Sequence, residues 1–267
     1  MAVRLGGIVF LNARPLTLAL DGDPGPFQVR YGVPSQCAAE LHAGQTDLGL
    51  IPSIEYARGP RPYCLVPQVC VASRGPVLTV RLYARRPWAQ IRRLALDLSS
   101  RTSVALVQIL LAEMHGLRPE LVSAAPDLDH MMSLADAALV IGDSVFRYPQ
   151  RSEAELDLGQ AWSAMTGLPF VYAFWVGRPG VIDGSQARHL VRARDLGRQR
   201  LGAIAAAFAA ERPEQSADYY QRYLTDHIHH DMGAAELAGL REFYRLARAH
   251  HLIDHVPELA SYDLADH

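Results

Sequence analysis

The sequence predicts an α/β fold made of two lobes, with a cleft between them and a helical C-terminal region. Three observations support this prediction. Short apolar runs of strand length alternate with segments that have the period of amphipathic helices. From about residue 184 onward the pattern is almost entirely helical, and no strand signal returns. Two long apolar runs, 77–85 and 170–177, are flanked by proline and glycine or arginine, as expected of strands that cross between lobes.

The predicted elements follow one another in α/β order. Strands are expected at 7–11, 46–51, 65–72, 77–83, 94–98, 137–141 and 170–176. Helical patterns with start and stop signals cover 34–44, 102–115 and 158–165, and further helical blocks cover 184–211, 215–226 and 233–251. This alternation favours mostly parallel sheets.

The two crossing runs divide the chain into its lobes. We expect residues 1–83 and 176–267 to form one lobe together, and residues 84–175 to form the other. In such an arrangement a ligand cleft lies between the lobes, where loops at strand ends converge. The candidate site is therefore expected in the loops that follow strands.

The composition argues against several classes of protein. A formal net charge of −2, a pI of about 6.6 and 49% hydrophobic residues describe an ordinary globular protein, with no basic excess that would suggest a nucleic-acid partner. The cysteines Cys37, Cys64 and Cys70 have neither a disulfide framework nor a CxxC spacing. No segment has the length of a membrane span and no secretory signal is present, so we expect a cytoplasmic protein without a membrane partner.

The polar block SSRTS, residues 99–103, separates a strand run from a helical segment. Serine and threonine at such a junction cap the first free amides of a helix, which accounts for one or two of these residues. A helix N-terminus also presents unpaired N–H groups and a partial positive charge. We therefore favour an anion site for a carboxylate or phosphate, built from Ser100, Arg101, Thr102 and Ser103, over capping beside a solvated arginine.

Three further loops place polar residues at the ends of predicted strands. FLNARPL, at 10–16, contains Asn12, and DLGLIPSIEY, at 47–56, contains Ser53 and Glu55 at the start of a short helix. ASRGPVLTV, at 72–80, leads into the first crossing run with Thr79 upon it. The first two loops also have a structural explanation: Asn12 can form a turn, and Ser53 and Glu55 can cap the helix.

Several motifs resemble those of a known family and occur in the same order along the chain. LNARPL, DLGLIPSIEY, SRGPVLTV, LALDLSSRTSVAL, ALVIGD and DLGQAWSAMTGLPFVYAFW resemble the MqnA/MqnD family of the futalosine route to menaquinone, specifically its chorismate dehydratase branch. The match covers roughly residues 5–178. The resemblance implies the fold of a type II periplasmic binding protein, which agrees with the two predicted lobes.

The resemblance also implies a reaction and a set of binding residues. Chorismate would lose water and give 3-[(1-carboxyvinyl)oxy]benzoate, and no cofactor is implied. Because this substrate carries two carboxylates, the helix start at Thr102 and Ser103 is expected to hold one, and the loop at Ser53 the other. The remaining residues expected to bind substrate are Thr79, Ser100, Arg101 and Gly142.

The residue that moves the proton is left open by the sequence. Asn12 cannot act as a base in its amide form, but it can hydrogen-bond the departing hydroxyl or the enolpyruvyl arm. The candidate protein bases are Glu55, Asp97 and Asp143, whose carboxylates would need pKa values raised by burial. The alternative, which we favour slightly, is that a substrate carboxylate acts as its own base. The catalytic candidates are thus Asn12, Asp143 and Glu55.

Three other interpretations compete with the dehydratase. A transport solute-binding protein should carry a signal peptide or anchor cysteine, and a transcription regulator should carry a DNA-binding helix pair. The sister lyase of the family, which acts on cyclic dehypoxanthine futalosine, has a histidine near the position of Gly142 and Asp143, and this departure favours the dehydratase. The C-terminal histidines, His267 among them, include an HxHH pattern, but without a carboxylate-framed motif we expect no metal.

Overall fold

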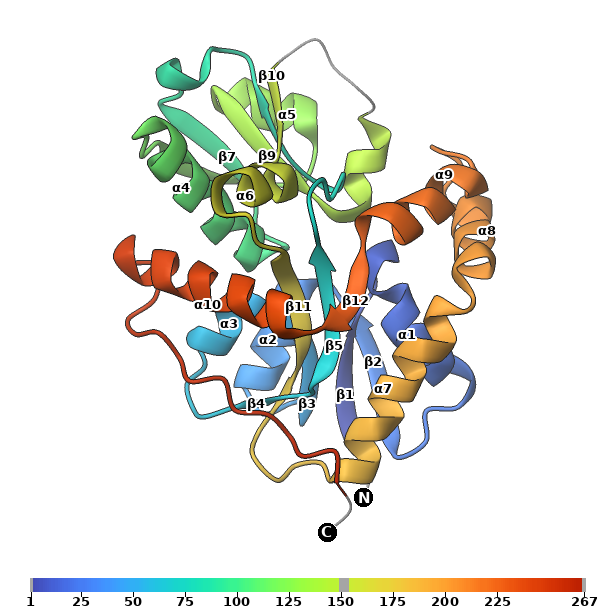
Figure 1. The fold of residues 1–267 in the computed structure, drawn as a ribbon. Helices are drawn as coiled ribbons and strands as arrows, with labels where there is room; N and C mark the ends of the chain where they lie inside the picture. Colours follow the sequence, from blue (N-terminus) through green and yellow to red (C-terminus); the bar gives the residue numbers. More distant parts are fainter. Residues whose placement is uncertain (1, 149–153, 266–267) are drawn as a thin grey trace.

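Two β-sheets with helices packed on them form the two lobes of the molecule (Figure 1). The computed structural model describes residues 2–148 and 154–265, and His267 lies outside this range. The larger sheet has the strand order β12-β5-β11-β3-β1-β2, with β4 also paired to β11. The smaller sheet has the order β10-β6-β9-β7-β8. The α/β architecture and the two lobes expected from the sequence are both present.

The strands of the larger sheet come from both ends of the chain. They are β1 (Val3–Ile8), β2 (Phe27–Gly32), β3 (Leu48–Pro52), β4 (Cys64–Leu65), β5 (Gln68–Ser73), β11 (Phe170–Gly177) and β12 (His229–Met232). The strands of the smaller sheet come from the middle of the chain. They are β6 (Val80–Ala84), β7 (Arg93–Asp97), β8 (Glu120–Ala124), β9 (Ala137–Ile141) and β10 (Ala154–Asp157).

The helices follow the strands and cover the faces of both sheets. In the larger lobe they are η1 (Leu11–Ala13), α1 (Arg14–Gly22), α2 (Pro34–His42), α3 (Ser53–Ala57), α7 (Gly184–Arg198), α8 (Leu201–Glu211), α9 (Ala217–Arg222), the π-helical η4 (Tyr223–His227) and α10 (Ala234–Ala249). In the smaller lobe they are η2 (Trp88–Gln90), α4 (Arg101–His115), α5 (Leu128–Leu134), η3 (Gly142–Arg147) and α6 (Leu158–Thr166).

The chain crosses between the lobes at different residues from those predicted. β6 pairs with β9 and β10 of the smaller sheet, whereas β11 pairs with β3, β4 and β5 of the larger sheet. The predicted boundaries, 83/84 and 175/176, fall inside these two strands. The crossings instead lie in 74–79 and 167–169, because each long apolar run is a strand of one sheet and only the glycine- and proline-containing segment before it passes between lobes.

Two further predictions about the sheets were wrong. The sheets are mixed rather than mostly parallel, because β11 runs antiparallel to β3 and β5, and β6 runs antiparallel to β9 and β10. A strand also returns within the helical C-terminal region, since β12 pairs antiparallel with β5. Its sequence, HHDM, has histidines where strand propensity favours branched or aromatic residues, so local pattern could not reveal it.

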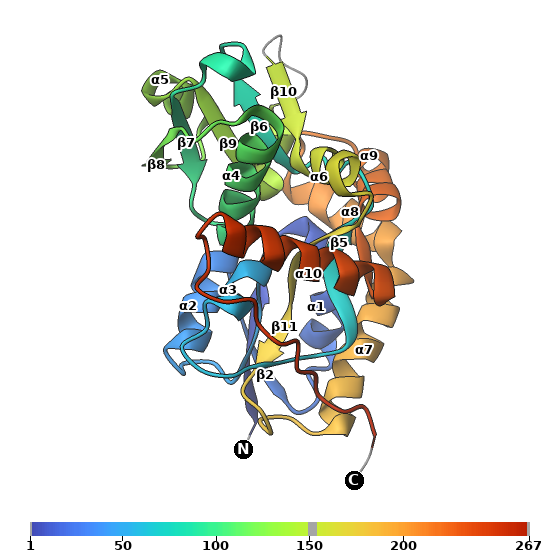
Figure 2. The same ribbon diagram turned by 60° about the vertical axis from the view of Figure 1, so that its left-hand side comes forward.

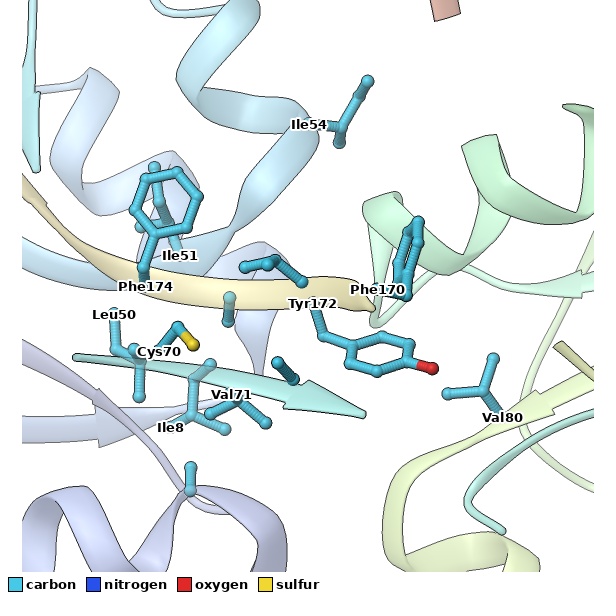
Figure 3. Close-up of a cluster of buried hydrophobic side chains, with 14 of the residues drawn as sticks. Ile8, Leu50, Ile51, Ile54, Cys70, Val71, Val80, Phe170, Tyr172 and Phe174 are labelled. Carbon is cyan, nitrogen blue, oxygen red and sulfur yellow. The ribbon is translucent and has the colours of Figure 1, made fainter. Parts of the chain in front are cut away.

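A continuous apolar core joins the lobes through β11, whose eight residues are all buried. Figure 3 shows this region, with Tyr172 extending from β11 of the larger lobe toward Val80 of the smaller lobe. On one side of the molecule α10 packs against both α4 and β11, below α4 and α6 in Figure 2. Within the part of the chain that the structure describes, no helix has the length and apolarity needed to cross a bilayer.

Candidate functional site

A pocket lies between the two lobes, where the ends of several strands meet. The larger lobe contributes residues from η1 and from the strands and helices around it, namely Ile8, Phe10, Asn12, Pro34, Pro52, Val71, Tyr172 and Ala173. The smaller lobe contributes Thr79, Val80, Ser100, Ser103, Ile141 and Gly142. Its walls are mostly apolar, with a few polar side chains, as is usual for small-molecule sites.

The first turn of α4 supplies two adjacent hydroxyls to this pocket. Ser100 is the N-cap residue, because its Oγ accepts a hydrogen bond from the Ser103 backbone N–H at 3.5 Å. The two hydroxyl oxygens lie 3.0 Å apart and both side chains line the pocket. The helix behind them is fifteen residues long, so its N-terminal partial positive charge is directed at the same place. This end of the pocket is suited to a carboxylate.

The two residues between these serines face away from the pocket. Thr102 Oγ1 accepts a hydrogen bond from the Ile54 backbone N–H at 3.2 Å and lies 3.4 Å from Ser53 Oγ. Ser53 Oγ in turn donates to the Val171 carbonyl at 2.8 Å. Arg101 points to an acidic residue of α3. Neither Ser53, Arg101 nor Thr102 lines the pocket, and together they fasten α4 to the larger lobe.

Glu55 is the acidic partner of Arg101 and is only 2% exposed. Its carboxylate lies 2.6 Å from Arg101, 3.1 Å from His42 Nε2 and 3.4 Å from Arg58. Burial acts to raise the pKa of Glu55, but the hydrogen bond with His42 and the charges of Arg101 and Arg58 outweigh it and lower that pKa overall. Glu55 is therefore a carboxylate held ionised by cations, and it does not line the pocket.

Asn12 lines the pocket from η1, the short helix that follows β1. Its backbone carbonyl is 2.8 Å from Nε2 of His230, a buried residue of β12. Burial lowers the pKa of His230 to about 4, so the ring is neutral near pH 7 and Nε2 carries the proton that it donates to Asn12. The contact fixes the Asn12 backbone, and the Asn12 side chain forms a hydrogen bond with the hydroxyl of Tyr223 beside the pocket.

Thr79 lines the pocket immediately before β6, beside a buried tyrosine of the C-terminal region. Its Oγ1 is 2.8 Å from the hydroxyl of Tyr223, in η4. Burial raises the pKa of Tyr223, although its hydrogen bonds with Thr79 and Asn12 act in the opposite direction. Tyr223 therefore stays a neutral phenol that links polar side chains of the two lobes behind the pocket wall.

Gly142 and Asp143 both follow β9, but only Gly142 lines the pocket. Gly142 lines the pocket with a φ of +64°, its N–H donates to the Thr79 carbonyl at 2.8 Å, and a Cβ there would lie 2.9 Å from the ring of Phe10. The carboxylate of Asp143 instead accepts the backbone N–H of Leu11, at 3.1 and 3.2 Å from its two oxygens. Burial raises the pKa of Asp143 to about 7.

The remaining predicted base, Asp97, ends β7 outside the pocket lining. It is buried and accepts the N–H of Ser99 at 2.9 Å. Burial raises its pKa, and the hydrogen bonds from Ser99 oppose this shift. Asp97 therefore accepts a backbone hydrogen bond at the end of a strand, which is a structural role that its place in the sequence allows.

The structure thus brings together five of the predicted residues in one pocket: Asn12, Thr79, Ser100, Ser103 and Gly142. Sequence reasoning missed Phe10, Tyr223 and His230 as parts of this site. Phe10 precedes Asn12 in the quoted loop and could have been included, but the two C-terminal residues reach the site only through β12 and η4, which no local signal placed there. Among the described residues, no group of three or more histidine, cysteine or acidic side chains is arranged to hold a metal ion.

The sequence matches one protein family and a curated relative. Residues 3–249 match the model of a family described as menaquinone biosynthesis. A chorismate dehydratase from Thermus thermophilus is 31% identical to this chain over 222 residues, which cover 76% of this chain and 79% of that protein.

Solved structures with the same architecture have much lower sequence identity. Protein AF1704 from Archaeoglobus fulgidus has a TM-score of 0.76 and 16% identity, covering 94% of this chain and 98% of its own. The periplasmic aliphatic sulphonate binding protein SsuA from Escherichia coli has a TM-score of 0.66 and 16% identity, covering 96% of this chain and 94% of its own. The fold is that of the periplasmic binding proteins, as the sequence resemblance implied.

Proposed function

Because this chain belongs to the menaquinone biosynthesis family, we propose that it is a chorismate dehydratase, which removes water from chorismate and gives 3-[(1-carboxyvinyl)oxy]benzoate. The observation that carries this proposal is the pocket between the lobes, which has two hydroxyls at a helix N-terminus on one side and the Asn12 side chain on another. Apolar walls separate these polar groups, so the pocket suits a ring substituted with polar groups.

One substrate carboxylate binds at the first turn of α4 in this proposal. Ser100 and Ser103 donate their hydroxyl protons to it, and the helix dipole favours its negative charge. Arg101 acts indirectly, since its pairing with Glu55 holds the turn in place. Ser53 and Thr102 are likewise assigned to holding this turn, because their hydroxyls contact backbone atoms.

Asn12 is assigned to the reacting side of the ring. Its amide donates a hydrogen bond to the departing hydroxyl or to the enolpyruvyl arm, while the contact from His230 to its carbonyl keeps it in position. Phe10 and Tyr172 are large apolar surfaces of the same pocket, and the ring lies against them. Such walls exclude water and fix the orientation of the ring.

The elimination breaks one C–H bond and one C–O bond of the ring. The electron pair of the C–H bond enters the ring, the hydroxyl leaves and is released as water, and the product becomes aromatic. None of the three candidate protein carboxylates, Glu55, Asp97 and Asp143, lines the pocket. Their positions support a substrate carboxylate as the proton acceptor, with the protein orienting the ring and stabilising the departing hydroxyl. No metal or other cofactor is assigned a step.

A second candidate function has some support from the fold alone. SsuA is a binding protein, and a non-catalytic protein of this architecture could bind a small anion at the α4 N-terminus. The sister lyase activity on cyclic dehypoxanthine futalosine has less support. A histidine at residue 142 would need a positive φ and would meet the ring of Phe10.

Mass spectrometry of the products separates these functions. Purified protein, treated with a chelator, is incubated separately with chorismate and with cyclic dehypoxanthine futalosine. We expect chorismate to lose one water and the second compound to remain unchanged. Conversion of the second compound alone would assign the lyase activity, and binding of chorismate without conversion would leave only an anion-binding role.

A further inference from the structure

A hydrogen-bonded contact beside the pocket connects the smaller lobe to the larger. Both carboxylate oxygens of Asp143, in η3, accept the backbone N–H of Leu11, in η1, at 3.1 and 3.2 Å. Asp143 is separated from Leu11 by 132 positions in the chain, and the two short helices contact each other. The contact therefore depends on how the lobes are placed relative to one another.

The N–H of Leu11 belongs to the first residue of η1, where helical amides lack a partner within the helix. The side chain of Phe10, the N-cap residue, makes no capping hydrogen bond with this amide. Asp143 thus caps this helix from the other lobe. The next residue along η1 is Asn12, whose side chain lines the pocket.

We propose that Asp143 is a positioning residue that caps η1 across the cleft and holds Asn12 in its working position when the lobes are closed. This assignment rests on the proposed dehydratase function for its kinetic consequence, but the cap itself does not. Asp143 is not the proton acceptor in this proposal, because its oxygens are directed at Leu11 and only the neighbouring Gly142 lines the pocket. Geometry takes precedence over pKa in choosing a general base.

The surroundings of Asp143 favour its neutral form. Burial raises its pKa to about 7, while the hydrogen bond with Leu11 and the charge of Arg212 act to lower it and Glu214 acts to raise it. The phenols of Tyr220 and Tyr223 also interact electrostatically with Asp143, and Arg147, which pairs with Glu214, lies on the same short helix η3.

The effect of pH on this cap follows from the raised pKa of Asp143. A solvated aspartate in an open form has a pKa near 4, so closing the lobes raises the pKa and favours the protonated acid. A neutral carboxyl still has a carbonyl oxygen that accepts the Leu11 N–H. Capping should therefore persist as the pH falls from 8 to 5, and an asparagine, which resembles the neutral acid, should preserve it.

Hydrogen exchange of the Leu11 amide, measured by NMR, tests the cap without reference to activity. We expect Asp143→Ala to lower the protection factor of Leu11 at least tenfold, and Asp143→Asn to keep it within about threefold of the wild-type value. The matched control is Asp136→Ala. Asp136 likewise accepts hydrogen bonds from backbone amides, those of Arg92 and Arg93, but it does so within the smaller lobe, and its loss should leave Leu11 protected.

Chorismate kinetics on the same variants test the consequence for the site. We expect kcat to fall at least tenfold in Asp143→Ala and to recover to within about threefold of wild type in Asp143→Asn. Unchanged Leu11 protection in Asp143→Ala would overturn the proposal, as would an Asp143→Asn variant that keeps Leu11 protected yet is as slow as the alanine variant. A wild-type protein that lacks turnover but shows the expected exchange pattern would refute the dehydratase function while leaving the cap established.

Discussion

Ser100 and Ser103 face one another across the first turn of α4, with their hydroxyl oxygens 3.0 Å apart on the wall of the pocket. Between them, Thr102 points the other way and accepts the backbone N–H of Ile54. Neighbouring residues of one polar block therefore have separate tasks. Ser100 provides the helix cap that the sequence suggested for one or two hydroxyls, and Ser103 remains available to a ligand.

Ser103→Ala should weaken substrate binding more than stability. It removes one hydrogen bond to a carboxylate, worth about 1.5 to 3 kcal/mol, so KM for chorismate should rise about ten- to hundredfold. The cap at Ser100 stays, and the melting temperature should change little. Steady-state kinetics and thermal unfolding measure both effects. A normal KM in the folded variant would remove Ser103 from the binding site.

Thr102→Val should show the reverse behaviour. The buried N–H of Ile54 loses its acceptor, which costs about 1 to 3 kcal/mol in the free energy of unfolding. Turnover per folded molecule should stay near the wild-type value, because the side chain does not line the pocket. Denaturant unfolding combined with activity corrected for folded protein checks this prediction, and a kinetic defect without destabilisation would contradict it.

Asn12→Ala should lower kcat for chorismate about a hundredfold, the usual cost of removing one hydrogen-bond donor that stabilises a reacting oxygen. Stability should fall only by about 0.5 to 1.5 kcal/mol, because the substitution removes the side-chain hydrogen bond to Tyr223 but keeps the backbone carbonyl that contacts His230. Steady-state kinetics at saturating chorismate provide the measurement. Wild-type kcat in this variant would place the reacting side of the ring elsewhere.

His230 should make the protein less stable as the pH falls. Its pKa is about 4 in the folded protein and about 6.5 when solvated, so the unfolded chain takes up a proton first. The stability due to the neutral ring is complete above pH 6.5, and it is lost progressively as the pH falls from 6.5 to 4. Replacing His230 by glutamine, which keeps an N–H donor, should remove this slope from the unfolding free energy. The exposed His130→Gln provides the control and should leave the slope in place.

Glu55→Gln should destabilise the protein by about 3 kcal/mol, because it leaves Arg101, His42 and Arg58 without their shared carboxylate. The lowered pKa of Glu55 adds a second signature. Its stabilising effect is present above the solvated pKa of about 4.5 and is lost as the pH falls through the folded pKa, so the variant should lack this acid-dependent loss.

The control for Glu55 is a surface pair on α10. Glu242 pairs with Arg245 three residues on; the Arg245 side chain is largely exposed to water and that of Glu242 is partly exposed. Glu242→Gln should therefore cost at most about 0.5 kcal/mol. Equal losses of unfolding free energy in the two variants would show that the buried cluster has no special role in holding α4.

The sequence predicted the main features of the fold because the decisive signals were local. Apolar runs located β3, β5, β6, β7, β9 and β11, and the serine cap with its following apolar face located α4. The edge strands β2 and β8 were missed, since their half-exposed residues do not form apolar runs. The direction and sheet membership of β6 and β11 depend on pairing between distant segments, which periodicity does not encode.

The candidate site was predictable to the extent that its residues end strands. Asn12, Thr79 and Gly142 each follow or begin a strand, and they meet because those strand ends converge between the lobes. The orientation of each side chain was not predictable. Arg101 and Ser103 are two positions apart, yet one reaches Glu55 and the other lines the pocket, because successive residues on a helix point in directions about 100° apart.

The proposed reaction itself is tested most directly by proton NMR of chorismate during incubation with the purified protein in chelator-treated buffer. The ring signals of the cyclohexadiene should be replaced, one for one, by those of an aromatic ring that keeps its enolpyruvyl group. Ring signals that persist at high protein concentration, or a product that has lost the enolpyruvyl group, would contradict the dehydratase.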